Sequence, residues 1–262
     1  MKLYRINALI IRHLYLFKRS LPRLMDIFFW PVVELLLWGF LSLYLQKFEL
    51  DGLNILTVLL GAIIFWDFLS QSQRSISTSF LEDVWERNLL NIFVTPLRVS
   101  EFLVSSVILG LFRIILVGLV MTMLAFFLYH FNIFFFGFLL IPFVLNLLVF
   151  GWALGLFTTS IILRYGTAAQ VLAFGFITLV QPFSAVFYPV SVLPHSVQFL
   201  AYMIPSTYVF EGMRAVVAGG HLPANLLWGA VITNIFYIVL NLWLFYHMFA
   251  RVKERGTLMK LD

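Results

Sequence analysis

The sequence contains no cysteine and little charge. Without cysteine, the chain has no disulfide framework and no thiolate ligands for a metal. Charged residues make up 11% of its 262 residues, whereas an average soluble domain has about 25%. Hydrophobic residues make up 62%, and the mean hydropathy is +1.00. This composition excludes a water-soluble enzyme, a nucleic-acid-binding module and a disordered segment, and it indicates a polytopic membrane protein.

The motifs of several enzyme classes are also missing. No glycine is followed by lysine, so the sequence has no P-loop for nucleotide hydrolysis. The histidines are scattered and no H-E-x-x-H occurs, so we expect no metal site. No G-x-S-x-G motif of a serine hydrolase is present. We therefore expect a chain that is not itself an enzyme and that binds no cofactor of its own.

Six apolar stretches are long enough to cross a bilayer, which takes about 20 residues. Because backbone groups in lipid must satisfy their hydrogen bonds internally, we expect each stretch to be a helix. The fourth is longer than one crossing requires, and Pro142 predicts a kink in it. We therefore predict an all-α polytopic fold in a single domain. The predicted spans are Ile27–Leu45, Leu53–Ser70, Phe102–Tyr129, Ile133–Leu163, Thr167–Phe187 and Leu226–Ala250.

The distribution of lysine and arginine predicts the orientation. If the N-terminus lies inside, 14 of the 17 lysine and arginine residues fall in inner segments. Six of these lie within residues 1–25 and four within residues 251–262. The positive-inside rule then places both termini in the cytoplasm and the chain in the plasma (inner) membrane.

The N-terminal segment, residues 1–25, has the pattern of an amphipathic helix. Arg5, Arg12 and Arg19 repeat every seven residues on one face, and an apolar stripe follows another. We expect the apolar side in the headgroup boundary and the basic side towards anionic lipid. A plain membrane anchor and a docking element for a cytoplasmic partner are both compatible with this pattern. The stripe consists of Leu3, Ile6, Ile10, Leu14, Phe17 and Leu21.

A second amphipathic helix is predicted in the inner loop of residues 71–101, and Pro96 stops it. One face of this helix is acidic, with Glu82, Asp83 and Glu86. Because the other inner segments are basic, the acidic face favours a docking surface. A solvated helix that only joins two spans is the plainer alternative. The apolar face consists of Leu81, Val84, Trp85 and Ile92.

The predicted outer segment Tyr188–Asn225 combines prolines with two short apolar pieces, Ser196–Ile204 and Tyr208–Ala218. Each piece is too short to span and too hydrophobic for an ordinary exposed loop, so we expect re-entrant or interfacial helices. Irregular backbone at membrane depth must be buried in protein or line a cavity, which makes this segment a candidate outer gate. Glu211 and Arg214 have the spacing of a helical ion pair.

Three ionisable residues fall within the predicted spans, namely Glu34, Asp67 and Arg113. Charges at membrane depth are costly and usually functional. A Glu34–Arg113 ion pair and two side chains that reach water separately are equally compatible with the sequence. In the fourth span, Gly151 and Gly155 have the spacing that lets helices approach closely, a weak indication of a dimer seam.

Together these features resemble the ABC-2 type permeases, the membrane subunits of ATP-binding-cassette exporters. The stretch ERNLLNIFVTPLRVSE, from Glu86 to Glu101, resembles the loop of that family between spans two and three. The proline pattern Tyr188-Pro189, Leu193-Pro194 and Ile204-Pro205, followed by Glu211 and Arg214, resembles its outer signature before the last span. The resemblance covers essentially the whole chain. It divides the domain into residues 1–25, 27–187, 188–225, 226–250 and a cytoplasmic tail, 251–262.

The resemblance implies a transport function. Two permease subunits would pair in membrane lipid, each bound to a cytoplasmic P-loop ATPase that holds ATP and Mg²⁺, and no nucleic acid would be involved. The complex would export a hydrophobic or lipid-linked substrate of the drug, lipid or glycan class. The coupling helix would occupy about residues 81–96, with Glu82, Asp83, Glu86 and Arg87 as ATPase contacts. The outer gate would include Tyr188, Pro189, Pro194, Pro205, Glu211 and Arg214.

The main alternative is a secondary transporter or channel subunit that needs no ATPase. Proton-coupled carriers usually place several carboxylates within their spans. Here the spans offer only Glu34 and Asp67, and predicted spans four to six carry no charge. This scarcity favours the exporter.

Overall fold

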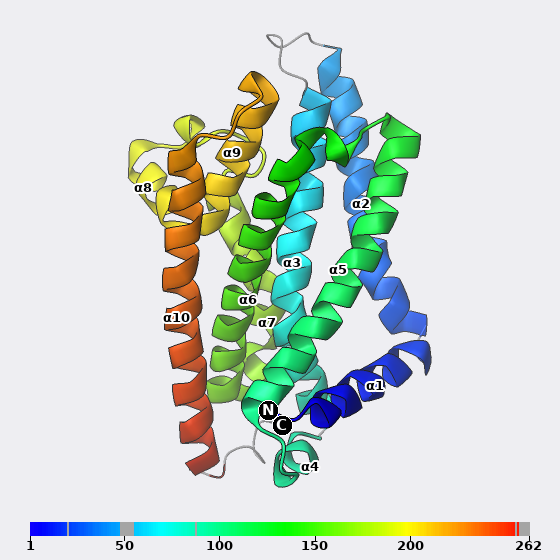
Figure 1. Ribbon diagram of the computed structural model, residues 1–262, viewed down its shortest axis with the longest axis vertical. Coiled ribbons are helices and arrows are strands. Elements are labelled where there is room, and N and C mark those ends of the chain that lie inside the picture. Colours follow the sequence, from blue (N-terminus) through cyan, green and yellow to red (C-terminus); the bar gives the residue numbers. More distant parts are fainter. Residues whose placement is uncertain (20, 48–54, 87, 255, 257–262) are drawn as a thin grey trace.

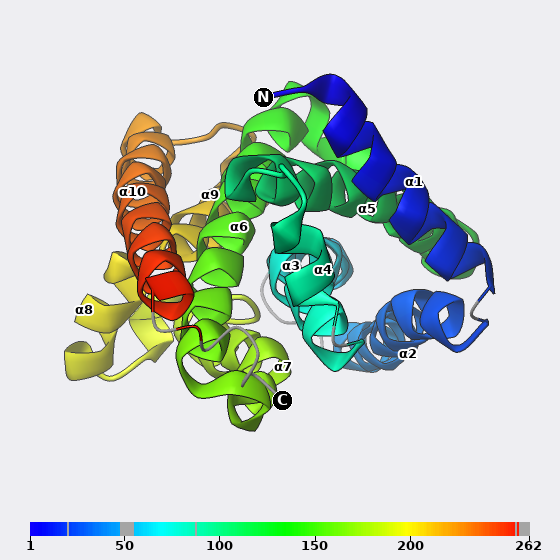
Figure 2. The same ribbon diagram turned by 90° about the horizontal axis from the view of Figure 1, so that it is seen from below.

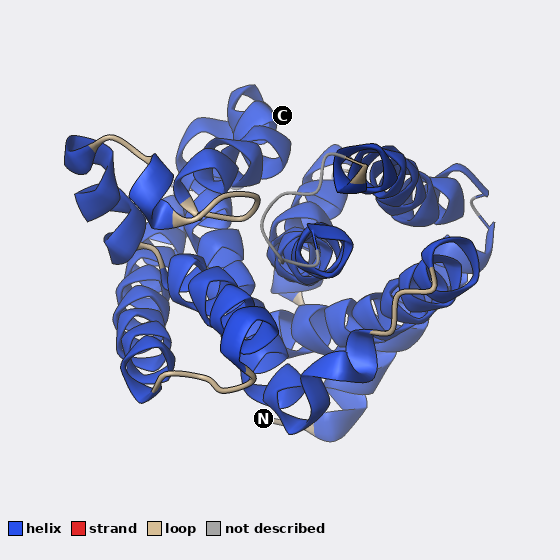
Figure 3. Cartoon of the chain, turned by 90° about the horizontal axis from the view of Figure 1, so that it is seen from above, coloured by secondary structure: helices blue, strands red, loops and turns tan. Residues whose placement is uncertain are grey.

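The computed structural model describes residues 1–19, 21–47, 55–86, 88–254 and 256. Within these residues every regular element is a helix, and the long helices form one bundle (Figures 1 and 3). The α-helices are α1 Leu3–Arg19, α2 Leu21–Gln46, α3 Ile55–Trp85, α4 Leu89–Val94, α5 Val99–Tyr129, α6 Leu140–Tyr165, α7 Gln170–Val180, α8 His195–Met203, α9 Pro205–Gly219 and α10 Ala224–Glu254. The 3₁₀ turns are η1 Ile133–Leu139, η2 Gly166–Ala169, η3 Gln181–Phe183 and η4 Val190–Val192.

Five helical segments of the described chain are long and apolar enough to cross a membrane. They coincide with predicted spans one to four and six, so the all-α polytopic class is confirmed. The segments are Ile27–Gln46, Ile55–Trp85, Val99–Tyr129, Ile133–Tyr165 and Ala224–Glu254.

The fifth predicted span, Thr167–Phe187, is not a single long helix. Its α-helical part, α7, has 11 residues, which rise only about 16 Å. Gly166, with φ 65°, precedes it and belongs to η2, and Pro182, which has no N–H to donate, lies in η3 after it. Five long helices and this broken segment therefore take the place of the six predicted spans.

The fourth span is broken at Gly137 rather than at Pro142. Gly137 has φ 53° and ψ −133°, a conformation that suits glycine, and the chain before α6 forms the 3₁₀ turn η1. Pro142 is the third residue of α6, where a backbone N–H has no partner within the helix. The missing donor of Pro142 therefore costs nothing there.

Helix α3 forms the centre of the bundle and packs against α2, α5, α6, α7 and α9. Its contact with α6 is close because two glycines face it. A Cβ at Gly151 would lie 2.5 Å from the carbonyl oxygen of Leu69, and one at Gly155 would lie 2.8 Å from that of Gln73. The Gly151–Gly155 pair is thus part of an α3–α6 seam within the chain, so it does not indicate a dimer seam.

The two ends of the bundle differ. At one end, here called the α1 end, α1 lies across the bundle next to α4 (Figures 1 and 2). The last turns of α10 lie at the same end. At the opposite end, the α8 end, α8 and α9 form the two short helices predicted at residues 196–204 and 208–218. Helix α9 is part of the core, because Val209, Phe210 and Met213 are buried in it.

Candidate functional site

At the α1 end, Arg12 of α1 binds two acidic residues, Asp83 near the end of α3 and Glu86 directly after it. Arg12 Nη2 donates to Asp83 Oδ1 at 2.6 Å and to Glu86 Oε2 at 3.2 Å. The side chain of Asp83 is 1% exposed, whereas that of Arg12 is 28% exposed. Helix α1 thus covers the carboxylate of Asp83 with a guanidinium and holds the end of α3.

A second contact of α1 reaches the first turn of α5. Glu101 Oε2 accepts the backbone N–H of Arg98 at 2.9 Å, which caps α5. Its Oε1 accepts the backbone N–H of Lys2 at 2.8 Å, and Arg5 Nη1 lies 3.5 Å from Oε2. Arg5 also donates to the carbonyl of Pro96. We call Arg5, Arg12, Asp83, Glu86 and Glu101 the α1 ion network.

This network corrects the expected orientation of α1. Arg5 and Arg12 face the carboxylates of the chain itself. The apolar stripe is divided, because Ile6 is buried, whereas Leu3 is 78% exposed and Leu14 is 41% exposed. Seven residues are almost two turns of helix, so Arg5 and Arg12 fall on one face, towards α3 and α5. The side chain of Arg19 is outside the described part.

The predicted coupling helix at residues 81–96 is two elements. Residues 81–85 are the last turns of α3, and α4 begins at Leu89 after a turn. Asp83 is buried and cannot contact a partner at the surface, Glu82 is half-buried and Glu86 is exposed. Arg87 lies outside the described residues. Of the predicted acidic face, Asp83 is therefore covered by α1, whereas Glu86 remains exposed.

Helices α1 and α4 border a groove of ≈ 570 Å³. Its polar groups include Arg5 and Arg12 of α1, Asn88 at the start of α4 and Asn91 within α4. Leu9 and Ile92 contribute to its apolar wall. The groove thus joins α4 to two arginines of the α1 ion network.

At the α8 end, the predicted Glu211–Arg214 ion pair is present and has a further role. Arg214 Nη2 donates to Glu211 Oε1 at 3.0 Å, and the same oxygen accepts the backbone N–H of Val190 at 2.7 Å. Arg214 Nη1 donates to the carbonyl of Val186 at 3.3 Å. Burial lowers the pKa of Arg214, and the nearby Glu211 opposes this shift. The pair therefore holds the loop of residues 184–192 against α9.

The predicted gate residues lie in or beside the 184–192 loop. The hydroxyl of Tyr188 donates to the carbonyl of Pro182 at 2.6 Å. Pro189 precedes η4, Pro194 precedes α8, and Pro205 is the first residue of α9, where its fixed φ suits a helix start. Phe187 of the loop stacks on Trp38 of α2, with ring centroids 3.9 Å apart. Because Trp38 is eight residues below the end of α2, the loop reaches about 12 Å along that helix.

The ionisable residues of the spans form a different arrangement from the suggested Glu34–Arg113 pair. The guanidinium of Arg113 lies over the ring of Phe17 of α1, 4.0 Å from its centroid. Glu34 is exposed on α2 and interacts electrostatically with Arg74 of α3. Arg74 Nη2 also lies 3.9 Å from Asp67 Oδ1. Glu34 and Arg113 thus have different neighbours. Arg74, which falls in the predicted inner loop of residues 71–101, belongs to α3.

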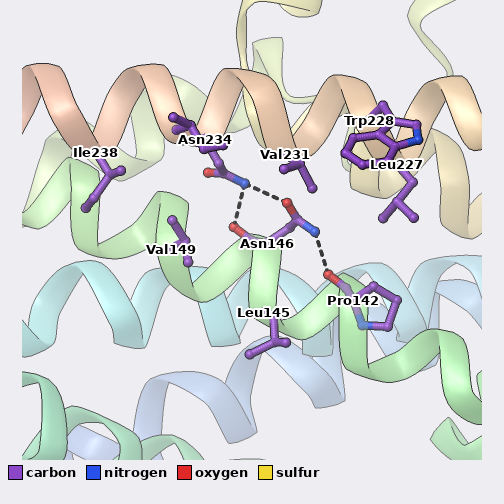
Figure 4. A pocket seen from close by; sticks show the side chains of 10 residues that line it. Pro142, Leu145, Asn146, Val149, Leu227, Trp228, Val231, Asn234 and Ile238 are labelled. Carbon is purple, nitrogen blue, oxygen red and sulfur yellow. Dashed lines mark hydrogen bonds between the residues drawn. The ribbon is translucent and has the colours of Figure 1, made fainter.

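Helices α6 and α10 are joined by a pair of asparagines, next to a groove of ≈ 400 Å³ (Figure 4). Asn234 Nδ2 donates to Asn146 Oδ1 at 2.9 Å and to the Asn146 carbonyl at 3.1 Å. Asn146 Nδ2 donates in turn to the carbonyl of Pro142 at 2.8 Å. In apolar surroundings this chain of hydrogen bonds fixes α10 on α6.

The arrangement is a bundle of long apolar helices with one charged end, where α1 binds α3 and α5, and one end with the short helices α8 and α9. A family model described as ABC-2 type transporter matches residues 4–218. The chain belongs to the ABC-2 type transporter family. The match includes the α1 ion network, α3, α4 and most of α9.

Relatives of known name agree with this membership. Two proteins named "Inner membrane transport permease YadH", from Escherichia coli (strain K12) and Shigella flexneri, are each 22% identical over 196 residues. The aligned part covers 74% of this chain and 76% of each relative. Together with the apolar helices, the family identifies a multi-pass transport permease of the inner-membrane type.

Proposed function

We propose that this ABC-2 permease is the transmembrane subunit of an exporter driven by a separate cytoplasmic ATPase. Two permease subunits would form a pathway that moves a hydrophobic or lipid-linked substrate, of the drug, lipid or glycan class, out of the cytoplasm or inner leaflet. The family membership supports the transport subunit, and the partner chain would supply the ATP and Mg²⁺ site.

In this proposal the α1 end faces the cytoplasm. The end carries Lys2, Arg5, Arg12 and the basic last turn of α10, with Arg251 and Lys253. The positive-inside rule assigns such an end to the cytoplasm. The α8 end, with the 184–192 loop, then faces outward.

The observation that carries the proposal is the continuity of α3. This helix of 31 residues runs from the α8 end through the centre of the bundle and ends one short turn before α4. A displacement of α4 by a bound ATPase would therefore move the central helix directly. The α1 ion network joins the same point to α5, because Arg12 binds Asp83 while Arg5 and Lys2 bind Glu101.

At the outward end, the same helix contacts α9, whose Glu211 and Arg214 hold the 184–192 loop. We therefore assign this loop to the outer gate. The exposed surface near α4, which includes Glu86, Thr95 and Pro96, would be the ATPase contact. Asp83 would not contact the ATPase and would act indirectly, by holding α1 in place.

The first experiment is purification of the tagged chain from its native membranes in a mild detergent. A P-loop ATPase in stoichiometric amount, whose activity is lost when its P-loop lysine is changed, would support the exporter. A chain that purifies alone, where a known ATP-binding-cassette complex stays intact, would contradict it and favour the secondary transporter or channel.

A charge reversal then tests the coupling surface. We expect Glu86→Lys to leave membrane insertion intact and to lower ATP-driven transport by an order of magnitude or more, because it places a cation beside Arg12 at the exposed edge of the α1 ion network. Glu254→Lys, the same reversal at the exposed end of α10, is the matched control and should leave transport unchanged. Equal transport in the two variants would remove Glu86 from the coupling surface.

A further inference from the structure

Three charged side chains of α2 and α3 meet within the membrane part of the bundle. Glu34 is 12 residues from the end of α2 at Gln46, and Asp67 is 12 residues from the start of α3 at Ile55. Each distance is about 18 Å of helix, and α2 and α3 are packed neighbours, so the two carboxyl groups lie at similar depth. Arg74 lies two turns further along α3 and interacts electrostatically with both Asp67 and Glu34.

The ion pair within this cluster is loose. Arg74 Nη2 lies 3.9 Å from Asp67 Oδ1, and Glu34 is attracted to the same guanidinium. Among the described residues, the other oxygen of the Asp67 carboxylate, Oδ2, has no hydrogen-bond partner, although Asp67 is only 4% exposed. An unpaired carboxylate oxygen in buried surroundings is costly, so a further cation near the cluster would be stabilising.

Glu34 is the member of the cluster that an outside molecule can reach. It is exposed on α2 in the middle of an apolar face, where Trp30 is 53% exposed and Leu37 is 57% exposed. Trp30 lies one turn from Glu34 towards the α1 end, so its ring is placed to contact a cation held by the carboxylate. One turn in the other direction, Trp38 stacks on Phe187 of the 184–192 loop.

We propose that the face of α2 around Glu34 binds an organic cation with an apolar body. The carboxylate of Glu34 would bind the positive charge, Asp67 would add negative potential from behind, and Trp30 and Leu37 would contact the apolar part. Free inorganic ions lack that apolar part and would gain nothing from the exposed face. In the exporter, a role which rests on the proposed function, this site would receive a cationic amphiphile on its way to the loop at Phe187.

The test uses the purified full chain in detergent and two probes of similar size, the tetraphenylphosphonium cation and the neutral triphenylphosphine oxide. Binding is measured by equilibrium dialysis. We expect the cation to bind the unchanged chain, and Glu34→Gln to weaken that binding about tenfold or more. Glu34→Asp, which keeps the charge, should retain most of the affinity, and Glu254→Gln, a neutralisation far from the cluster, should change nothing.

Equal affinity of the unchanged chain and Glu34→Gln for the cation would overturn the proposal. So would equal binding of the neutral probe, because the apolar face alone would then explain both results. The dialysis needs no ATPase. Cation binding that depends on Glu34 in a chain that purifies without an ATPase would keep the site and reject the exporter. An active ATPase complex that exports but does not bind the cation would do the reverse.

Discussion

Both ends of the bundle are held by an arginine–carboxylate contact, but the two contacts are built differently. At the α1 end, Arg12 and Asp83 are 71 residues apart and join two helices through side chains alone. At the α8 end, Glu211 and Arg214 are three residues apart on one helix, and each also binds a backbone group of the 184–192 loop. The first contact joins helix to helix, whereas the second joins a helix to a loop.

The difference determines how each contact can be replaced. A contact between two charged side chains can be removed as a pair, because neutralising both leaves no charge buried alone. A contact between a side chain and the backbone cannot be removed in this way. The N–H of Val190 and the carbonyl of Val186 remain when the side chains are changed, and they lose their partners. Paired substitutions should therefore restore stability at the α1 end and fail to do so at the α8 end.

The largest effect is expected for Arg12→Ala. This change leaves the carboxylate of Asp83, whose side chain is 1% exposed, without the guanidinium that binds it. Removing one partner of a buried ion pair costs about 3 kcal/mol or more, and Arg12 is partly exposed, so we expect about 2–3 kcal/mol in the free energy of unfolding. Unfolding in mixed detergent micelles measures this value.

The matched control is the double variant Arg12→Ala/Asp83→Asn. The double variant removes the buried charge together with its partner, so it should be more stable than Arg12→Ala alone. Its loss of unfolding free energy should also be smaller than the sum of the losses of the two single variants. Purely additive single and double effects would contradict the contact between Arg12 and Asp83.

The next effect is expected for Glu211→Ala, at about 2 kcal/mol. It removes the acceptor of the Val190 N–H and leaves Arg214 without its carboxylate. Here the double variant Glu211→Ala/Arg214→Ala should recover little, since the backbone N–H is still unpaired. Recovery comparable to that at the α1 end would show that the loop is not held through its backbone. Protease cleavage within residues 184–192 gives an independent measure of loop release.

The same distinction explains which contacts could be predicted from the sequence. Glu211 and Arg214 were predicted as a pair because a spacing of three residues fixes their neighbourhood on any helix. The short helices α8 and α9 followed from apolar pieces bounded by prolines. The partners of Arg5 and Arg12 did not follow, because a heptad spacing shows that the arginines share a face but not what that face contacts. Anionic lipid and the carboxylates of the chain satisfy the same pattern.

Two further differences between the predicted and the observed helices have separate causes. The polar residues after Ser70 favour an end of the second span there, but α3 continues to Trp85. Ser72 and Ser75 are buried, Ser72 donates to the Leu148 carbonyl of α6, and Ser75 donates to the Ser72 carbonyl. Pairing within the bundle, which the sequence does not display, replaces the water that these groups would otherwise need. The fifth span was predicted as one helix from its apolar character, whereas Gly166 and Pro182 set its limits locally.

The smallest effect is expected for Arg5→Ala, and it separates charge from hydrogen bonding within the α1 ion network. Glu101 is as buried as Asp83, but it keeps the backbone N–H groups of Arg98 and Lys2 when Arg5 is removed. We therefore expect a loss of unfolding free energy well below that of Arg12→Ala. The control Glu101→Ala should cost more than Arg5→Ala, because it leaves both N–H groups unpaired and uncaps α5. An equal loss of unfolding free energy for Arg5→Ala and Arg12→Ala in the same micelle measurement would contradict this explanation. The hydrogen-bond donors that remain on each carboxylate would then not determine the loss, and long-range charge would be its cause.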